Sequence, residues 1–132
     1  MALRITLTSE GSPAEQIRDQ IRGLVATDQL PAGQRIPSVR QLATDLGVAP
    51  GTVAKAYRQL EAAGLLQTRV GAGTRVHPEA STTPAEVIER ARALATTAAS
   101  AGVSLEDTIR IVRAVWPNPP ALSEEPAANR SR

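Results

Sequence analysis

The polar side chains of residues 38–75 are mostly hydrogen-bond donors and not the groups that catalyse reactions. Arginine, threonine and glycine recur there beside Lys55 and Ser38, while cysteine and histidine are absent from this segment. Guanidinium and ammonium groups donate to phosphate oxygens and to guanine O6 and N7, and hydroxyl groups contact phosphates or a thymine methyl group. Residues of these types can recognise duplex DNA if the fold presents them on one surface.

The residue arrangements that enzymes use are missing from the sequence. The chain has no cysteine, and its one histidine, His77, cannot build a metal site unaided. No glycine-rich segment matches a phosphate-binding loop or a dinucleotide fingerprint. The acidic residues at positions 86, 89, 106 and 107 lie in expected first turns of helices, where interaction with the helix dipole accounts for them. We therefore expect no catalysis, no cofactor and no metal site.

The net charge of +2 is small and unevenly distributed. Residues 1–78 contain nine basic and six acidic residues, a net of +3, whereas residues 79–132 contain six and seven, a net of −1. This excess alone would not indicate nucleic acid. No apolar run approaches the ~18 residues of a membrane-spanning helix, and the N-terminus lacks a signal-peptide pattern, so we expect a cytoplasmic protein.

The sequence from Ser38 to Gly64 predicts two short helices joined by a tight turn. Ser38 and Gln41 have the spacing of a capping box. Gly47 suits the end of the first helix, and Pro50 suits the start of the second. Each helix has one apolar face at helical spacing. These faces are Val39, Leu42, Ala43 and Leu46, then Val53, Ala56, Tyr57 and Leu60. The pattern is typical of a helix-turn-helix, although an ordinary pair of core helices would share it.

A glycine-containing hairpin follows directly. Its expected arms are Gln67–Val70 and Thr74–His77, and Gly71-Ala72-Gly73 forms the loop. Arg69 lies on one arm and Arg75 on the other. A helix pair followed by a basic hairpin is more specific than either part alone and predicts a winged helix-turn-helix.

Two further segments complete this N-terminal part. Ser12, Pro13 and Glu15 are typical of a helix start. Apolar residues then recur at helical spacing: Ile17, Ile21, Leu24 and Val25. Near the N-terminus, apolar residues at positions 3, 5 and 7 indicate a short strand or extended arm, whose pairing partner the sequence does not reveal.

The C-terminal part is expected to contain two helices within residues 84–116, after a short linker. Segments shorter than about 40 residues rarely hold a core alone. The apolar faces of these helices must pack back onto the N-terminal part or pair with a second copy. We favour a homodimer, because two-fold dimers read DNA operators as half-sites. Residues 117–132 are rich in proline and poor in apolar residues, which predicts a disordered tail.

These expectations give a mostly α fold with a small β-hairpin. Residues 1–78 form a winged helix-turn-helix DNA-binding domain, residues 84–116 form a two-helix dimerisation region, and residues 117–132 form the tail.

The chain resembles the GntR family of transcriptional regulators across roughly residues 13 to 76. The matching segments are Leu30–Arg40, Leu46–Val48, Thr52-Val53, Leu60–Leu65 and Gly71–Thr74. Ala56-Tyr57-Arg58 and the short C-terminal part resemble the YtrA-type subgroup. The resemblance implies a regulator, commonly a repressor, that dimerises through its C-terminal region.

The helix-turn-helix is expected to supply the main DNA contacts. In the GntR family the arginine of the Pro-Ser-x-Arg segment contacts DNA, and Arg40 occupies that position. The second motif helix is expected to lie in the major groove. Its candidate contacts are Gly51, Thr52, Lys55 and Arg58. Lys55 suits guanine, whereas Arg58 suits a phosphate or solvent. Ser38 is foremost a helix cap, and a phosphate contact is compatible with that role.

The hairpin is expected to add contacts to phosphates or a narrow minor groove. Its candidates are Arg69, Gly71, Gly73, Thr74 and Arg75. Simple hairpin geometry also accounts for the glycines. Many family members have a Ser/Thr-Arg-Thr run where this chain has Ala49-Pro50-Gly51. Base readout therefore shifts to Arg40, Lys55 and the backbone N–H groups at the helix start.

Two alternative functions remain open: a winged helix that binds protein partners, and a DNA binder without sequence specificity. A small-molecule effector is also undecided. Two helices are expected to be too small to enclose a pocket of ~300 Å³ within one chain. The options are no effector, a ligand at the dimer interface, or control through protein level alone.

Overall fold

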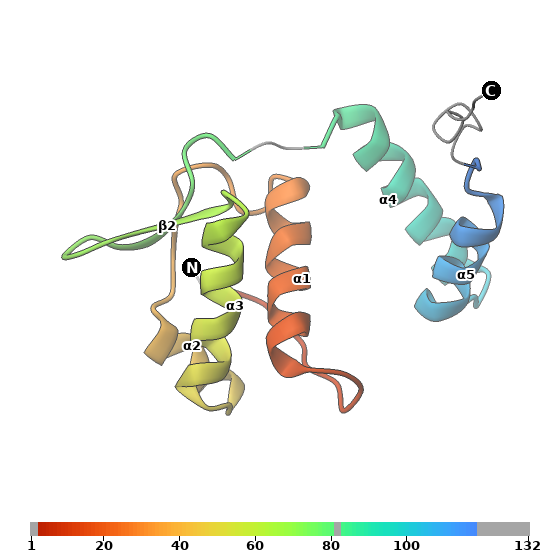
Figure 1. Cartoon of the computed structure of the whole chain (residues 1–132). Coiled ribbons are helices and arrows are strands. Elements are labelled where there is room, and N and C mark those ends of the chain that lie inside the picture. Colours follow the sequence, from red (N-terminus) through yellow and green to blue (C-terminus); the bar gives the residue numbers. More distant parts are fainter. Residues whose placement is uncertain (1–2, 81–82, 119–132) are drawn as a thin grey trace, which may run out of the picture. The chain divides into compact units, whose positions relative to one another are not determined.

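The computed structural model describes residues 3–80 and 83–118, and the predicted tail falls largely outside them. The chain divides into two compact units, Met1–Pro84 and Ala85–Arg132. The first unit contains α1 (Pro13–Ala26), β1 (Arg35–Ile36), α2 (Val39–Leu46), α3 (Pro50–Ala62), β2 (Leu66–Arg69) and β3 (Gly73–Val76). The second contains α4 (Ala85–Ser100) and α5 (Leu105–Val115) (Figure 1). Mostly helical structure with a small hairpin was predicted, and it is confirmed.

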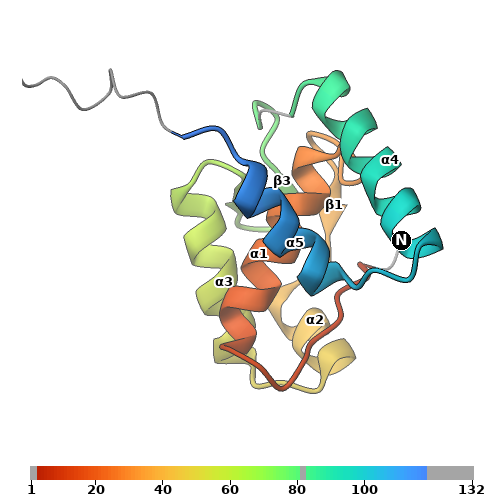
Figure 2. The same ribbon diagram turned by 90° about the vertical axis from the view of Figure 1, so that its right-hand side faces the viewer.

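Helix α1 begins as the sequence predicts and packs against α3. The Ser12 hydroxyl accepts a hydrogen bond from the backbone N–H of Glu15 at 3.3 Å, and Pro13 occupies the first turn, where its missing N–H costs nothing. Most of the apolar side of α1 is buried: Ile17 and Ile21 are both 0% exposed, and Leu24 is partly buried. Figure 2 views the molecule from the side on which α1 lies in front of α2 and α3.

The segment before α1 is an extended arm that two glutamine side chains hold against the helix. The Gln20 amide accepts from the Thr6 N–H at 2.9 Å and donates to the Thr6 carbonyl at 2.7 Å. Gln16 does the same for Thr8, at 2.8 and 3.1 Å. These amides take the place of a neighbouring strand, and Ile5 is thereby buried in the core.

The helix-turn-helix has the predicted ends but only half of the predicted capping box. The Ser38 hydroxyl accepts from the Gln41 N–H at 3.1 Å, as expected. The Gln41 side chain does not reach back; it donates to Asp45 at 2.8 Å, one turn further along α2. Gly47 then ends α2 with a φ of 68°, in the left-handed region that glycine adopts at low cost. The tight turn that follows places α3 across α2.

The hairpin is part of a three-stranded antiparallel sheet with strand order β1-β3-β2. Strand β1, which the sequence analysis did not identify, pairs Arg35 with Arg75 and Ile36 with Thr74. Strand β2 pairs Gln67 with Arg75 on the other side of β3. The inner face of the sheet closes the core between α1, α2 and α3, since Ile36, Leu66 and Val76 are all buried.

Helices α4 and α5 form a separate helical hairpin. The Ser104 hydroxyl caps α5 by accepting from the Asp107 N–H at 3.1 Å. The two helices contact each other, yet neither has a buried residue. Large apolar side chains are exposed on both helices and at the end of α5: Val87, Leu94, Leu105, Ile109, Ile111, Val115 and Trp116.

Candidate nucleic-acid interface

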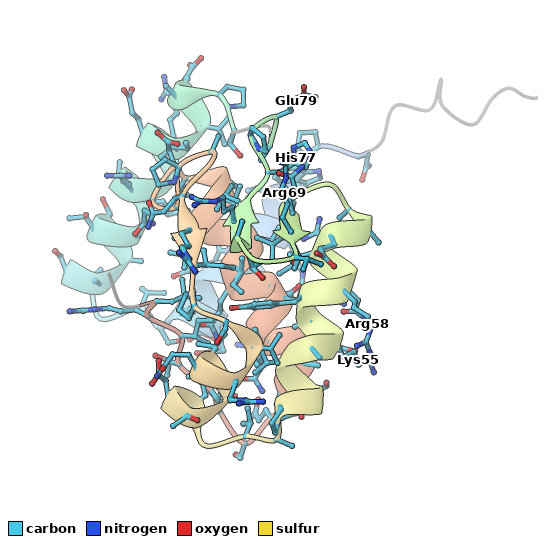
Figure 3. All side chains as sticks on the ribbon, turned by 90° about the vertical axis from the view of Figure 1, so that its left-hand side faces the viewer. Lys55, Arg58, Arg69, His77 and Glu79 are labelled. Atoms are coloured by element: carbon cyan, nitrogen blue, oxygen red, sulfur yellow. The ribbon has the colours of Figure 1, made fainter. Side chains whose placement is uncertain are left out.

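The solvent-facing side of α3 carries the residues predicted to meet the major groove. Gly51, Lys55 and Arg58 are exposed, and Thr52 is half-buried at the helix start. Lys55 and Arg58 project from α3 one turn apart, and Arg69 lies on the hairpin, which points toward the viewer (Figure 3). No side chain caps the N-terminus of α3, because Ala49 occupies the capping position. The positive end of the α3 dipole is therefore open to an anion.

Arg40 lies in the first turn of α2, exposed to solvent. The Ser38 hydroxyl oxygen accepts the capping hydrogen bond, which leaves the hydroxyl hydrogen for a second acceptor. A cap and a phosphate contact are thus compatible at this position. The turn between α2 and α3 brings the helix that carries Arg40 and the helix that carries Lys55 into direct packing.

Tyr57 fixes the spacing of these two helices. Its ring is buried in the core, and its hydroxyl donates to the Pro37 carbonyl at 2.7 Å. Burial raises the pKa of Tyr57, so the hydroxyl keeps the proton that it donates. The bond holds α3 to the residue that immediately precedes the Ser38 cap.

The two faces of the sheet separate the wing candidates. Arg69 and Arg75 are exposed on the outer face. Thr74 is only 6% exposed, and its hydroxyl lies 3.1 Å from that of Thr68. The structure gives Thr74 a packing role and does not bring it together with the basic side chains. Gly71 and Gly73 have φ values of 82° and 77°, so the tight hairpin accounts for both glycines.

Arg35 joins the outer face through strand β1. It lies opposite Arg75 in the β1–β3 register, and its guanidinium crosses over Gly73, where an added Cβ would lie 3.1 Å from its Nε atom. Sequence reasoning placed Arg35 within the family match but gave it no role. A two-residue strand leaves no alternation pattern, so the sequence contained no signal for its pairing with β3.

The basic side chains of this surface have no acidic partner among residues 3–80 and 83–118. The ion pairs within 4.0 Å in that part of the chain are Arg18–Asp19, Arg90–Glu86 and Arg110–Asp107. None involves the basic residues of β1, α2, α3 or the hairpin. These residues are Arg35, Arg40, Lys55, Arg58, Arg69 and Arg75. The surface therefore presents positive charge that nothing in the described chain neutralises.

His77 lies beside the hairpin (Figure 3) and already has a structural contact. Its Nδ1 atom accepts from the Glu79 backbone N–H at 3.0 Å, which orders the chain after β3. The described residues contain no group of three or more histidine or acidic side chains that could hold a metal ion. No described helix is long and apolar enough to cross a membrane.

An apolar groove of about 320 Å³ runs between α4 and α5. It is lined by alanine side chains of α4 together with Leu94, Val103, Leu105 and Thr108. Its volume lies at the lower end of the range for ligand pockets, about 300 to 1,000 Å³. The groove is open to solvent, so the expectation that two helices cannot enclose such a pocket within one chain stays a prediction. Thr108 is the one polar residue of the lining, so the groove suits apolar side chains.

Comparison with known proteins agrees with this geometry. The sequence profile for bacterial regulatory proteins of the gntR family matches residues 13–76. HTH-type transcriptional regulator Rv1152 of Mycobacterium tuberculosis is 44% identical over 72 residues, which are 54% of this chain and 60% of that protein. HTH-type transcriptional repressor YtrA of Bacillus subtilis is 39% identical over 97 residues, 70% of this chain and 75% of YtrA.

A solved structure also matches. The crystal structure of the AraR DNA-binding domain in complex with operator ORX1 is 26% identical to this chain, with a TM-score of 0.50. The match covers 58% of this chain and 98% of that domain.

The chain spans less than two thirds of the M. tuberculosis relative but three quarters of B. subtilis YtrA. The profile match and the extended similarity to YtrA, together with the winged helix-turn-helix, show that this chain belongs to the gntR family of bacterial regulatory proteins and is of the YtrA type.

Proposed function

We propose that this protein is a sequence-specific DNA-binding transcriptional regulator that acts as a homodimer in the cytoplasm. The observation that carries the proposal is the set of basic side chains on α2, α3 and the hairpin, none of which is paired with an acid in the described chain. The operator-bound state of the similar AraR domain supports it. Residues 1–78 are the DNA-binding domain in this proposal.

In the proposed complex α3 enters the major groove. Its N-terminal residues Gly51 and Thr52 approach the DNA, and Lys55 donates to a guanine. Arg40 contacts DNA from α2, Ser38 adds a phosphate contact, and Arg58 meets a phosphate. The hairpin residues 69–75 lie on the minor groove or the backbone. Arg69 and Arg75 supply the charge there, and the glycines allow close approach.

Residues 84–116 are the proposed dimerisation region. Their two helices leave large apolar side chains exposed, with Leu105 at 68% and Trp116 at 69%. An unpaired surface of this kind marks a protein interface. A second copy of the same hairpin would bury both surfaces and would place two α3 helices on the half-sites of an inverted repeat. Repression is the proposed outcome, by likeness to the YtrA repressor.

Selection of bound duplexes from a randomised DNA pool at about 150 mM salt tests this proposal. We expect enrichment of an inverted repeat whose half-sites lie about one helical turn apart. Binding without enrichment would instead support a DNA binder that lacks sequence specificity. In that case the Ala49-Pro50-Gly51 segment has removed base readout. Complete lack of binding would favour the protein-interaction alternative. A pull-down that compares the unsubstituted protein with a variant neutralised at Arg40 and Lys55 would then test that alternative.

A further inference from the structure

The outer face of the sheet holds two arginines directly opposite each other. Arg35 of β1 and Arg75 of β3 are partners in the antiparallel register, and both are exposed. Like charges at directly opposed positions destabilise a sheet. No acidic side chain of residues 3–80 or 83–118 lies within 4.0 Å of either guanidinium. The outer face therefore carries positive charge that no described acid offsets within this distance, and an anion bound to this face would be stabilised by it.

Both side chains are already positioned. The Arg75 Nη1 atom donates to the Gly33 carbonyl at 3.3 Å, which holds its guanidinium near the loop before β1. The Arg35 guanidinium lies against the backbone of Gly73, since a Cβ added there would come within 3.1 Å of both Nε and Nη2. Arg69 is the register partner of Gly73 on the far strand. Arg35 and Arg69 thus come from the two strands on either side of Gly73, which has no side chain to cover the sheet. The Arg75 guanidinium adds positive charge nearer the other end of β3.

We infer that this outer face binds the phosphate backbone of duplex DNA and that Arg35 is a DNA-contacting residue beside Arg69 and Arg75. The inference rests on the proposed function and adds Arg35 to the contacts described above. A phosphodiester accepts two hydrogen bonds from one guanidinium, in the planar geometry that arginine provides. Arg35 near Gly73 and Arg75 near Gly33 suit successive contacts along the phosphate backbone. Gly73 has a specific role in this arrangement, because a larger residue would displace the Arg35 guanidinium.

The test compares Arg35→Gln with Arg22→Gln in the full chain. The glutamine substitution keeps a polar side chain but removes the charge. Arg22 is a matched control, since it is exposed on α1 with no hydrogen bond or ion pair to a described residue, and Figure 1 draws α1 on the side of α3 away from the β2–β3 hairpin. Affinity is measured for a duplex recovered from the randomised pool and for a shuffled duplex, at salt concentrations from about 50 to 200 mM.

We expect Arg35→Gln to weaken binding to both duplexes by roughly tenfold. The slope of log affinity against log salt should fall by about 1, the value for one lost phosphate contact. Arg35→Lys should keep the slope, because it keeps the charge. Arg22→Gln should change neither quantity. The melting temperature of free Arg35→Gln should not fall, because the Arg35 side chain makes no hydrogen bond or ion pair to a described residue that the substitution would remove.

An unchanged slope of log affinity against log salt in Arg35→Gln would overturn the inference. A loss of affinity confined to the recovered duplex would also overturn it, because that result indicates base readout. A lower melting temperature with an unchanged slope would also overturn it, since Arg35 would then be structural. If Arg35→Gln does not fold, Arg35→Ala is measured by the same criteria. Failure of this inference is distinct from failure of the proposed function, in which the unsubstituted protein binds neither duplex.

Discussion

The Tyr57 hydroxyl donates a hydrogen bond of 2.7 Å to the Pro37 carbonyl, twenty residues earlier in the chain. Tyr57 is in the middle of α3, and Pro37 immediately precedes the cap of α2. This single bond therefore joins the helix proposed to enter the major groove to the start of the helix that carries Arg40. The bond therefore adds to the apolar packing that holds these two proposed DNA-contacting helices in one relative position.

Replacement of Tyr57 by Phe should lower the stability of the winged unit by about 1 kcal/mol, the usual contribution of a hydrogen bond of this kind. Such a loss corresponds to a fall in melting temperature of roughly 4–8 °C for a unit of this size. Thermal unfolding followed by circular dichroism measures it. Thr108→Val is the control, because it removes a hydroxyl hydrogen bond of 2.8 Å from the other unit. Equal melting of the winged unit in Tyr57→Phe and the unsubstituted protein would contradict the role given to this bond.

Arg40→Ala and Lys55→Ala should each weaken binding to a recovered inverted repeat by about 1–3 kcal/mol and reduce discrimination against shuffled DNA. Both side chains are exposed and have no acidic partner in the described chain, so their removal leaves the fold intact. Arg58→Ala, at a proposed phosphate contact, should weaken binding to the two duplexes equally. Titration by fluorescence anisotropy distinguishes these results. A uniform loss in Arg40→Ala would assign Arg40 to the phosphate backbone instead.

Gly73→Ala and Gly71→Ala should separate backbone strain from the positioning of Arg35. Both glycines have positive φ, so each alanine should cost about 1–2 kcal/mol of stability. An alanine Cβ meets Arg35 only at position 73, since Gly71 has nothing within 4 Å. Gly73→Ala should therefore lower DNA affinity more than Gly71→Ala does. This extra loss should vanish in an Arg35→Gln background, which a double-mutant cycle measures. Equal losses in both backgrounds would show that strain alone is responsible.

Leu94→Glu should convert the proposed homodimer to monomers. Leu94 lines the α4–α5 groove and is 41% exposed in the single chain. A carboxylate buried there in a dimer would cost several kcal/mol. Ala93→Glu is the control, because its neighbouring position does not line the groove. Sedimentation velocity should show monomers for Leu94→Glu alone, with the melting of the winged unit unchanged. Dimers that persist in Leu94→Glu would exclude this face as the interface.

Local signals made most of the fold predictable. Ser12, Ser38 and Ser104 each start a helix through a hydroxyl cap, and the sequence shows the serine and the residue whose N–H it accepts from. Gly47 ends α2 in the left-handed conformation, which glycine adopts at low cost and which its residue type therefore indicates. The apolar faces of α1 and α3 repeat at helical spacing and are buried as expected, apart from the partly buried Leu24. Each of these features depends on residues within about one or two turns of each other.

The missed features depend on contacts between distant residues. Gln16 and Gln20 read as ordinary polar positions of α1, yet they pair with the arm 8 and 14 residues away. Strand β1 is too short to have a pattern and forms only because β3 lies beside it. For the same reason the sequence could not assign Arg35 to the outer face. The alternation of β3 did contain the signal for Thr74, because Thr74 shares a face with the apolar Val76. The candidate surface was therefore predictable in its helices and only partly in its wing.

The attachment of the N-terminal arm has a consequence for how the protein leaves DNA. The four bonds that the Thr6 and Thr8 backbones make to the Gln16 and Gln20 amides join neutral groups, which gain no charge over the physiological pH range. Dissolved ions compete with arginine and lysine for phosphates, but they have little effect on an amide that faces a peptide group. A rise in ionic strength that releases the protein would thus leave Ile5 covered and α1 in place. Release and unfolding respond to different solution conditions, which allows repeated cycles of binding by an intact domain.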